Sequence, residues 1–322
     1  MINLRKCAVI GCGNVGATIA YALMQKGLYS EMVLIDVNHE KAVGEAADLT
    51  HGLPFLRPMQ IYAGNYASLA DASMIIISAG AGQRPGQKRT DLVRQNMRIF
   101  DSIIDQITIY NKEGILLVVT NPVDILTYHT IRRSGFPPSR VIGSGTVLDT
   151  GRLKALVGEA LGVDSRNVHS FIIGEHGDSE LAVWSSANVS GIDLNRFCHD
   201  CACDCTMEKL YPLYDEVKNS AYRIIEAKGA TYYGIAEAVC RIVSAIVHDE
   251  DTILPVSTLP DGQYGLHDLC LGLPSILNHT GVKEVLEIRL NDDEQRRLAQ
   301  SANALRQILD ETEKEALSGV RT

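Results

Sequence analysis

Short apolar runs alternate with amphipathic stretches through the first half of the chain. The apolar runs are residues 7–11, 32–36, 73–80 and 115–120. The hydrophobic spacing between them predicts helices over residues 14–26, from about residue 40, and before residue 115. Such alternation is typical of parallel strands joined by helical crossovers. Because the apolar runs carry no regular polar positions, we expect both faces of the sheet to be covered.

The pattern changes after about residue 145. Longer helices such as residues 206–228 follow, mixed with strands between residues 252 and 274 that Gly and Pro punctuate. Asn291 and Glu294 have the spacing of a capping pair at the start of a terminal helix. The second half is therefore predicted to form a mixed α+β domain over residues 146–322.

The composition is that of a globular protein large enough for two domains. The 322 residues are 46% hydrophobic, which allows a sizeable core. A net charge of −9 and a pI of about 5.5 argue against a nucleic-acid partner, which would require clustered Lys and Arg. The sequence shows no apolar signal segment and no apolar stretch long enough to cross a bilayer. We therefore expect a cytoplasmic protein with no membrane partner.

Four of the eight cysteines are clustered, namely Cys198, Cys201, Cys203 and Cys205. A zinc site normally uses two separated ligand pairs, so a structural zinc is the less favoured interpretation. Cys198, Cys201 and Cys205 instead follow an i, i+3, i+7 pattern, which predicts one apolar face of a helix. We expect these thiols to be reduced and no metal to be bound.

A glycine-rich turn joins the first predicted strand to the first predicted helix. Gly11 allows a tight turn, Gly13 lets the backbone approach a pyrophosphate, and Gly16 lets the helix pack on the strand. Asp36 ends the next apolar run, where its carboxylate can accept hydrogen bonds from ribose hydroxyls and would repel a 2′-phosphate. The predicted cofactor is therefore NAD, and the contact residues expected in the loop are Gly11, Gly13, Asn14, Val15 and Gly16.

These features predict an α/β fold with two domains. Residues 1–145 should form a Rossmann domain, a doubly wound parallel sheet that binds NAD, and residues 146–322 the mixed domain that binds substrate. A dinucleotide site alone does not name a reaction. A protein that binds NAD without catalysis, either regulatory or structural, is therefore one alternative.

Polar segments elsewhere in the chain carry a more specific signal. They are residues 80–89, 120–124, 148–152 and 173–178, with further motifs at 228–236 and 268–277. In this order, and together with the glycine loop, they resemble the lactate/malate dehydrogenase family over essentially the whole chain, and its lactate-specific bacterial members most closely. The resemblance implies hydride transfer between NADH and a 2-keto acid.

Reduction of a keto group by hydride also requires a proton donor. Histidine titrates nearest to neutral pH, and His176 lies between Gly174 and Gly177, which permit close approach of ligands. The resemblance implies that His176 is the acid–base group and that Asp149 hydrogen-bonds it. Asp149 and Arg152 are spaced i, i+3 and would share one face of a helix.

The remaining substrate contacts follow from the resemblance. Arg152 would bind the substrate carboxylate with its planar guanidinium, and Asn121 would orient the substrate and contact the cofactor. Arg89 ends a Gly-rich segment suited to a lid that closes over the substrate and would then stabilise the developing alkoxide. Gln83 and Thr231 would face the substrate side chain.

The substrate expected from these residues is pyruvate, reduced reversibly to L-lactate in the final step of fermentative glycolysis. A neutral Gln83 offers no counter-charge to a second carboxylate, whose burial would be costly. Oxaloacetate, as in malate dehydrogenases, and longer substrates of the 2-hydroxyisocaproate type are the alternatives.

The resemblance also implies a homotetramer and allosteric activation by fructose 1,6-bisphosphate. Lys154 lies two residues beyond Arg152 and therefore points away from the substrate face of its helix. In the family pattern Lys154 and His169 meet their symmetry mates across a subunit interface, where clustered cations would bind the bisphosphate. Allosteric relatives generally carry arginine in place of Lys154, so we expect weaker activation here.

Overall fold

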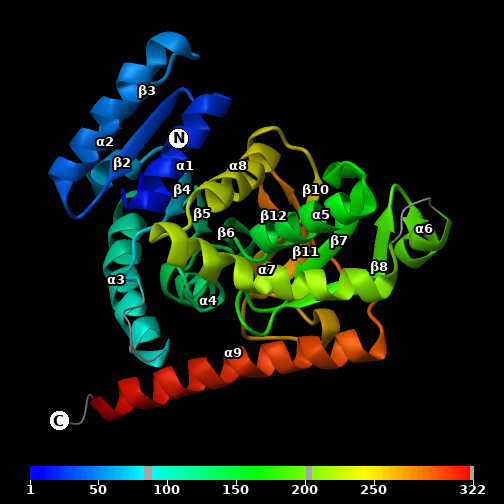
Figure 1. The fold of residues 1–322 in the computed structure, drawn as a ribbon. Coiled ribbons are helices and arrows are strands. Elements are labelled where there is room, and N and C mark those ends of the chain that lie inside the picture. Colours follow the sequence, from blue (N-terminus) through cyan, green and yellow to red (C-terminus); the bar gives the residue numbers. More distant parts are fainter. Residues whose placement is uncertain (83–88, 201–204, 320–322) are drawn as a thin grey trace.

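The computed structural model describes residues 1–82, 89–200 and 205–319 of the 322 residues. Within these ranges, helices cover a central nine-stranded sheet, and a three-stranded sheet lies beside it (Figure 1). The predicted α/β fold class is confirmed. No helix in the described ranges is both long and apolar enough to span a membrane.

The first half alternates strands and helices as predicted. Its strands are β1 (Asn3–Ile10), β2 (Glu31–Ile35), β3 (Gln60–Ala63), β4 (Ala72–Ile77), β5 (Ile115–Val118) and β6 (Val141–Gly143). Its helices are α1 (Asn14–Lys26), α2 (His39–Gly52), α3 (Arg89–Tyr110) and α4 (Val123–Ser134). The predicted bounds of the first helix agree with those of α1.

The second half mixes helices with mainly antiparallel strands. Its helices are α5 (Val147–Leu161), α6 (Leu194–Asp200), α7 (Met207–Lys228), α8 (Tyr233–Val247) and α9 (Asp292–Gly319). Its strands are β7 (Val168–Ile173), β8 (Leu181–Val189), β9 (Ile192–Asp193), β10 (Thr252–Thr258), β11 (Leu271–Asn278) and β12 (Gly281–Val285).

The large sheet has the order β12-β11-β10-β6-β5-β4-β1-β2-β3. Its pairs from β3 to β6 are parallel, and the chain reverses direction across the sheet between β1 and β4. β10 joins β6 in antiparallel orientation, with Ser257 opposite Gly143. Strands of the second half therefore extend the sheet of the first, and the predicted division between residues 145 and 146 stays a prediction.

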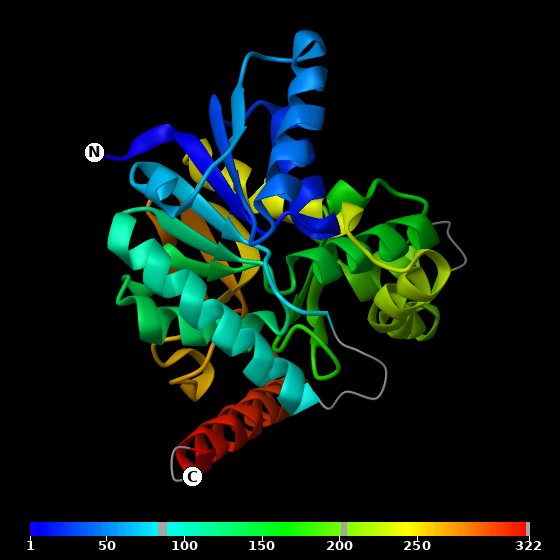
Figure 2. The same cartoon turned by 90° about the vertical axis from the view of Figure 1, so that its left-hand side faces the viewer.

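Alternate residues of the central strands enter two different cores. Val9 of β1 and Ile76 of β4 pack into the cluster that contains side chains of α1, α2 and α8. Their neighbours Ala8 and Ile75 pack into the opposite cluster, which contains side chains of α3 and α4. The two helical layers on either side of the sheet are visible in Figure 2. Burial on both faces explains why these strands are continuously apolar.

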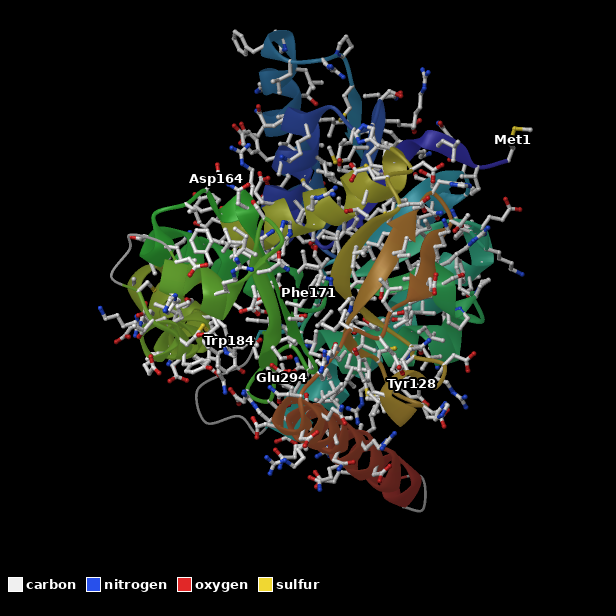
Figure 3. The ribbon with its side chains drawn as sticks, turned by 90° about the vertical axis from the view of Figure 1, so that its right-hand side faces the viewer. Met1, Tyr128, Asp164, Phe171, Trp184 and Glu294 are labelled. Atoms are coloured by element: carbon white, nitrogen blue, oxygen red, sulfur yellow. The ribbon has the colours of Figure 1, made fainter. Side chains whose placement is uncertain are left out.

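The terminal helix α9 begins at the predicted capping pair. The backbone N–H of Glu294 donates to Asn291 Oδ1, and the Asn291 N–H donates to Glu294 Oε2, each at 2.9 Å. Glu294 Oε1 also accepts the backbone N–H of Trp184 in β8 at 2.9 Å, and Figure 3 shows the two residues near each other. This capping residue therefore ties α9 to the three-stranded sheet.

The predicted helix through the cysteine cluster is wrong at its end. α6 is described as far as Asp200, and α7 begins at Met207 with Thr206 at its N-cap position. Cys205 is not helical, so it does not share a helix face with Cys198. Both thiols are free and buried in one apolar cluster, which explains their hydrophobic spacing. Cys201 and Cys203 lie outside the described residues.

Candidate active site

A cavity of about 790 Å³ opens near the carboxyl ends of β1, β2 and β4. Gly11, Gly13 and Asp36 line it, together with the apolar Ile10 and Ile35 at the strand ends. The cavity lies where the chain reverses direction across the sheet, and doubly wound sheets bind their ligands at that position. The glycine loop and the acidic residue predicted from the sequence therefore line the same cavity.

The three glycines of the loop differ in their surroundings. Gly11 has a φ of +96°, and a Cβ there would lie 2.5 Å from the Ala79 nitrogen. A Cβ at Gly16 would lie 1.8 Å from the Gly11 carbonyl oxygen, so α1 approaches the loop only because that side chain is absent. A Cβ at Gly13 would meet nothing within 4 Å. The Gly13 backbone is therefore open to a ligand in the cavity that it lines.

The start of α1 and the end of β2 fit the two polar parts of NAD. α1 begins at Asn14, next to the half-buried Val15, and no side chain caps it, so its first N–H groups are available to a pyrophosphate. The Asp36 carboxylate accepts backbone N–H groups from Cys12 at 2.7 Å and Asn38 at 2.8 Å. These bonds fix a negative charge where ribose hydroxyls would bind.

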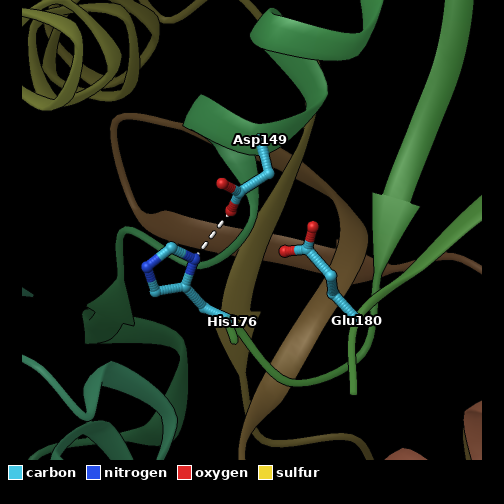
Figure 4. Close-up of side chains that lie close together, drawn as sticks. All are labelled: Asp149, His176 and Glu180. Atoms are coloured by element: carbon cyan, nitrogen blue, oxygen red, sulfur yellow. Dashed lines mark hydrogen bonds and ion pairs between the residues drawn. The ribbon is translucent and has the colours of Figure 1, made fainter. Parts of the chain in front are cut away.

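His176, Asp149 and Arg152 form a hydrogen-bonded cluster. Asp149 and Arg152 lie one turn apart on α5. His176 lies in the loop after β7, where it meets Asp149 (Figure 4). His176 Nδ1 and Asp149 Oδ2 are 2.6 Å apart, and Arg152 Nη1 donates to Asp149 Oδ1 at 2.9 Å. The Asp149 side chain is buried, so its charge is held between two basic groups away from water.

The charges of the cluster control its protonation. Burial would raise the pKa of Asp149, but the charges and hydrogen bonds of His176 and Arg152 hold that pKa below its usual value. Burial would lower the pKa of His176, but the charge and hydrogen bond of Asp149, with smaller effects of Glu180 and Asp124, raise that pKa to about 9. At neutral pH the cluster therefore presents an imidazolium, which can donate a proton to a substrate oxygen.

Sequence reasoning did not assign a role to Asp124, although this residue anchors the histidine loop. Its buried carboxylate accepts the backbone N–H of His176 at 2.7 Å and the Ser257 hydroxyl at 2.6 Å. The available signal was an acidic residue in the first turn of a helix that directly follows an apolar strand. Asp124 thereby links α4, β10 and the loop that carries His176.

Glu180 is a second residue that the sequence analysis missed. It is buried, and its carboxyl group lies near the Asp149–His176 pair (Figure 4). One carboxylate oxygen of each acid and one ring nitrogen of His176 all lie within 4.8 Å of one another. No local signal marks Glu180, because a glutamate just before a strand is usually exposed.

The structure describes the other predicted substrate residues to different extents. Asn121 lies between β5 and α4, with its backbone carbonyl accepting from Asn96 Nδ2 at 2.8 Å. Thr231 is half-buried between α7 and α8. In the described part of the chain, no hydrogen bond joins Asn121 or Thr231 to His176. Arg89 begins α3, but its side chain lies outside the described structure, as does the whole of Gln83.

Lys154 and His169 line a separate cavity of about 520 Å³, as does Arg241 of α8. Burial, with a smaller effect of the Arg241 charge, lowers the pKa of Lys154. Glu237 also lines this cavity, but it forms an ion pair with Lys26 at 3.0 Å. The structure thus brings the two predicted allosteric residues together beside a third basic side chain.

Comparisons with known proteins cover nearly the whole chain. Residues 5–143 match the NAD binding domain of lactate/malate dehydrogenases, and residues 146–316 match the alpha/beta C-terminal domain of the same family. The chain belongs to the lactate/malate dehydrogenase family. The predicted cofactor NAD and the predicted class, an NAD-dependent oxidoreductase, are thereby confirmed.

Individual members of the lactate/malate dehydrogenase family are also similar to the chain. The L-lactate dehydrogenase of Acetivibrio thermocellus is 53% identical over 307 residues, which are 95% of this chain and 96% of the relative. L-lactate dehydrogenase 1 of Clostridium acetobutylicum is 51% identical over 305 residues, 95% of this chain and 97% of that relative. The crystal structure of the minor L-lactate dehydrogenase from Enterococcus mundtii in its ligands-bound form superposes with a TM-score of 0.92 at 43% identity, covering 95% of this chain and 98% of the other.

Proposed function

We propose that this chain catalyses reversible hydride transfer between NADH and pyruvate, giving L-lactate and NAD. The observation that carries the proposal is the His176–Asp149–Arg152 cluster, which combines a charged proton donor with a guanidinium. Relatives named L-lactate dehydrogenase, about half identical over 95% of the chain, support the same reaction. As a cytoplasmic enzyme it would complete fermentative glycolysis.

The cluster supplies the protein's part of the chemistry. When bound, NADH provides the hydride that reaches the keto carbon, and NAD accepts it in the reverse direction. Because Asp149 engages His176 Nδ1, Nε2 is the nitrogen left to give its proton to the keto oxygen. Arg152 uses one Nη group on Asp149, which leaves other guanidinium donors for the substrate carboxylate. Proton donor and carboxylate anchor are thus held by one buried acid.

The roles of the lid and of the side-chain pocket are part of this proposal. Arg89 would stabilise the developing alkoxide, while Asn121 and Thr231 would orient the substrate. Gln83 would face the methyl group of pyruvate and leave a second carboxylate without a counter-charge. The position of Arg89 at the start of α3 is compatible with a residue carried by a closing loop.

The choice of substrate tests the proposed function directly. We expect kcat/KM with NADH to be at least about a hundredfold higher for pyruvate than for oxaloacetate, because burial of an unpaired carboxylate is costly. The measurement is initial-rate kinetics with pyruvate, oxaloacetate and 2-ketoisocaproate. A preference for oxaloacetate would overturn the role of Gln83. If none of the three keto acids supported NADH oxidation, a protein that binds NAD without catalysis would be favoured.

We also propose that the cavity at Lys154 and His169 binds fructose 1,6-bisphosphate in a homotetramer. Support comes from the three basic side chains that line it and from the altered pKa of Lys154, which a bound anion would restore. Exposed apolar side chains, such as Tyr21 of α1 and Tyr233 of α8, are compatible with further subunit contacts. Two copies of the cavity would face each other across a twofold axis.

Activation should be stronger in mild acid. We expect millimolar fructose 1,6-bisphosphate to lower KM for pyruvate by about fivefold near pH 6 and by less near pH 7.5, because histidine is charged more fully at the lower pH. Pyruvate saturation curves at both pH values, for the natural protein and for Lys154→Met, measure the effect. The variant should lose it. Superimposable curves with and without the bisphosphate at both pH values would refute the site.

A further inference from the structure

The carboxyl group of Glu180 is buried without a partner that would explain it. Glu180 is 5% exposed, and its Oε1 has no hydrogen-bond partner. An uncompensated buried carboxyl is costly, so the burial of this group calls for a physical explanation. Its oxygens point toward the Asp149–His176 pair, as Figure 4 shows.

The Glu180 side chain is not needed to hold its own loop. Its backbone carbonyl accepts a hydrogen bond from the Tyr214 hydroxyl of α7, and its backbone N–H donates to the Gly177 carbonyl at 3.3 Å. The local position of residue 180 is therefore fixed by main-chain bonds. The carboxyl group remains free to interact with charges in the site.

Charged groups from three elements face the Glu180 carboxyl. Asp149 and Arg152 approach from α5, His176 from the same loop, and Lys218 from α7. Lys218 already donates to the Asp178 carbonyl at 2.7 Å, and Arg152 is engaged by Asp149. His176 and Asp149 are therefore the groups with which the Glu180 carboxyl can interact electrostatically at close range.

A proton, rather than a metal ion, fits this arrangement. The three candidate ligand atoms lie within 4.8 Å of one another, but His176 Nδ1 is only 2.6 Å from Asp149 Oδ2. That distance is a hydrogen bond, so the lone pair of Nδ1 is replaced by an N–H directed at the carboxylate. A cation would have to break this bond before it could bind.

We propose that Glu180 is a positioning residue of the active site, whose buried carboxyl shares a proton equilibrium with the Asp149–His176 pair and keeps His176 protonated as the pH rises. The inference rests on the proposed function for its kinetic consequences, but the proton equilibrium itself is a property of the protein alone. Glu180 acts through His176 and does not contact the substrate.

The order of ionisation makes this coupling useful. Burial, with a further effect of the Asp149 charge, raises the pKa of Glu180 to about 8, while the pKa of His176 is about 9. At neutral pH Glu180 is therefore neutral, and the charges that favour protonated His176 are those of Asp149 and, with a smaller effect, Asp124. Above pH 8 Glu180 loses its proton. Its new negative charge then stabilises the imidazolium of His176 in the pH range where His176 would otherwise lose its own proton.

The test is Glu180→Gln, which fixes the neutral form without changing the size of the side chain. At about pH 6.5 kcat/KM for pyruvate should stay within about twofold of the natural protein, because Gln mimics the protonated acid. The alkaline limit of pyruvate reduction should move down by about one pH unit, so that the rate near pH 9 falls about fivefold. Oxidation of L-lactate needs neutral His176, so the acid limit of its pH profile should move to lower pH in the variant.

An NMR titration of His176 in the protein without ligands gives a readout independent of turnover. Its pKa should fall in Glu180→Gln and recover in part in Glu180→Asp. The matched control is Asp215→Asn, which removes an exposed carboxylate of α7 next to Tyr214 and should leave both the titration and the pH profile unchanged.

The outcomes separate the two proposals. An unchanged His176 titration and an unchanged alkaline limit in Glu180→Gln would overturn the role of Glu180. Absence of pyruvate reduction by the natural protein would instead overturn the proposed function, and the NMR titration would then decide on Glu180 alone.

Discussion

Replacement of His176 by asparagine should lower kcat/KM for pyruvate reduction by about 10²–10⁴-fold, the usual contribution of a positioned general acid. The substitution removes the imidazolium that Asp149 stabilises at 2.6 Å but leaves the NAD cavity and its glycine loop untouched. The dissociation constant of NADH, measured by fluorescence, should therefore change by less than about twofold. Turnover and cofactor binding are measured on the same preparation.

A second histidine–aspartate pair provides the matched control. His279 Nδ1 lies 2.7 Å from Asp249 Oδ1, but both side chains are exposed and lie outside both cavities described above. His279→Asn should leave kcat/KM within about twofold, because solvent screens exposed charges. Comparable losses in the two variants would mean that the effect of His176→Asn is general, and the assignment of the proton donor would fail.

Local sequence patterns predicted those elements whose formation depends on near neighbours. The bounds of α1 follow from its apolar spacing and from Gly27, which ends the helix with a φ of +60°. The capping pair Asn291 and Glu294 involves residues only three positions apart, so the start of the terminal helix was also predictable from local sequence. The antiparallel pairing of β10 with β6 joins distant segments, and no local pattern encodes that contact.

The same distinction divides the candidate site. The glycine loop and Asp36 form a local motif, whereas the roles of His176, Asp149 and Arg152 follow from the family resemblance. Neither a local motif nor the family resemblance pointed to Glu180, because its burial depends on α5, α7 and its own loop meeting in space. The position of Cys205 before α7, rather than on a helix, is likewise a feature that apolar spacing does not reveal.

The buried acid of the cluster leads to the second large expected effect. Asp149→Asn should lower kcat/KM for pyruvate at about pH 8 by about 10²–10⁴-fold, because two losses combine. The negative charge that favours the imidazolium disappears, and the amide can turn its NH₂ group toward His176 and select the wrong tautomer. Arg152 also loses its ion pair, so KM for pyruvate should rise as well.

The effect of Asp149 on the pKa of His176 determines the direction in which the pH limits move in Asp149→Asn. In the natural protein Asp149 raises the pKa of His176 to about 9, against the effect of burial. Without the carboxylate, burial dominates and should bring that pKa below the ordinary histidine value of about 6.5. Pyruvate reduction requires the protonated ring, so its alkaline limit should fall by more than two pH units, whereas lactate oxidation should lose less at high pH, where the ring is neutral in both proteins.

Rate profiles in both directions, from about pH 5.5 to about pH 9.5, measure these shifts. Asp249→Asn, which removes the acid from the exposed His279 pair, is the matched control and should leave both profiles in place. An alkaline limit that stays near pH 9 in Asp149→Asn would contradict the electrostatic role of Asp149. If the rate fell equally at every pH, and neither the limit for pyruvate reduction nor that for lactate oxidation moved, the role of Asp149 would be only to orient the His176 ring. The direction and size of the shift therefore separate charge from geometry at this residue.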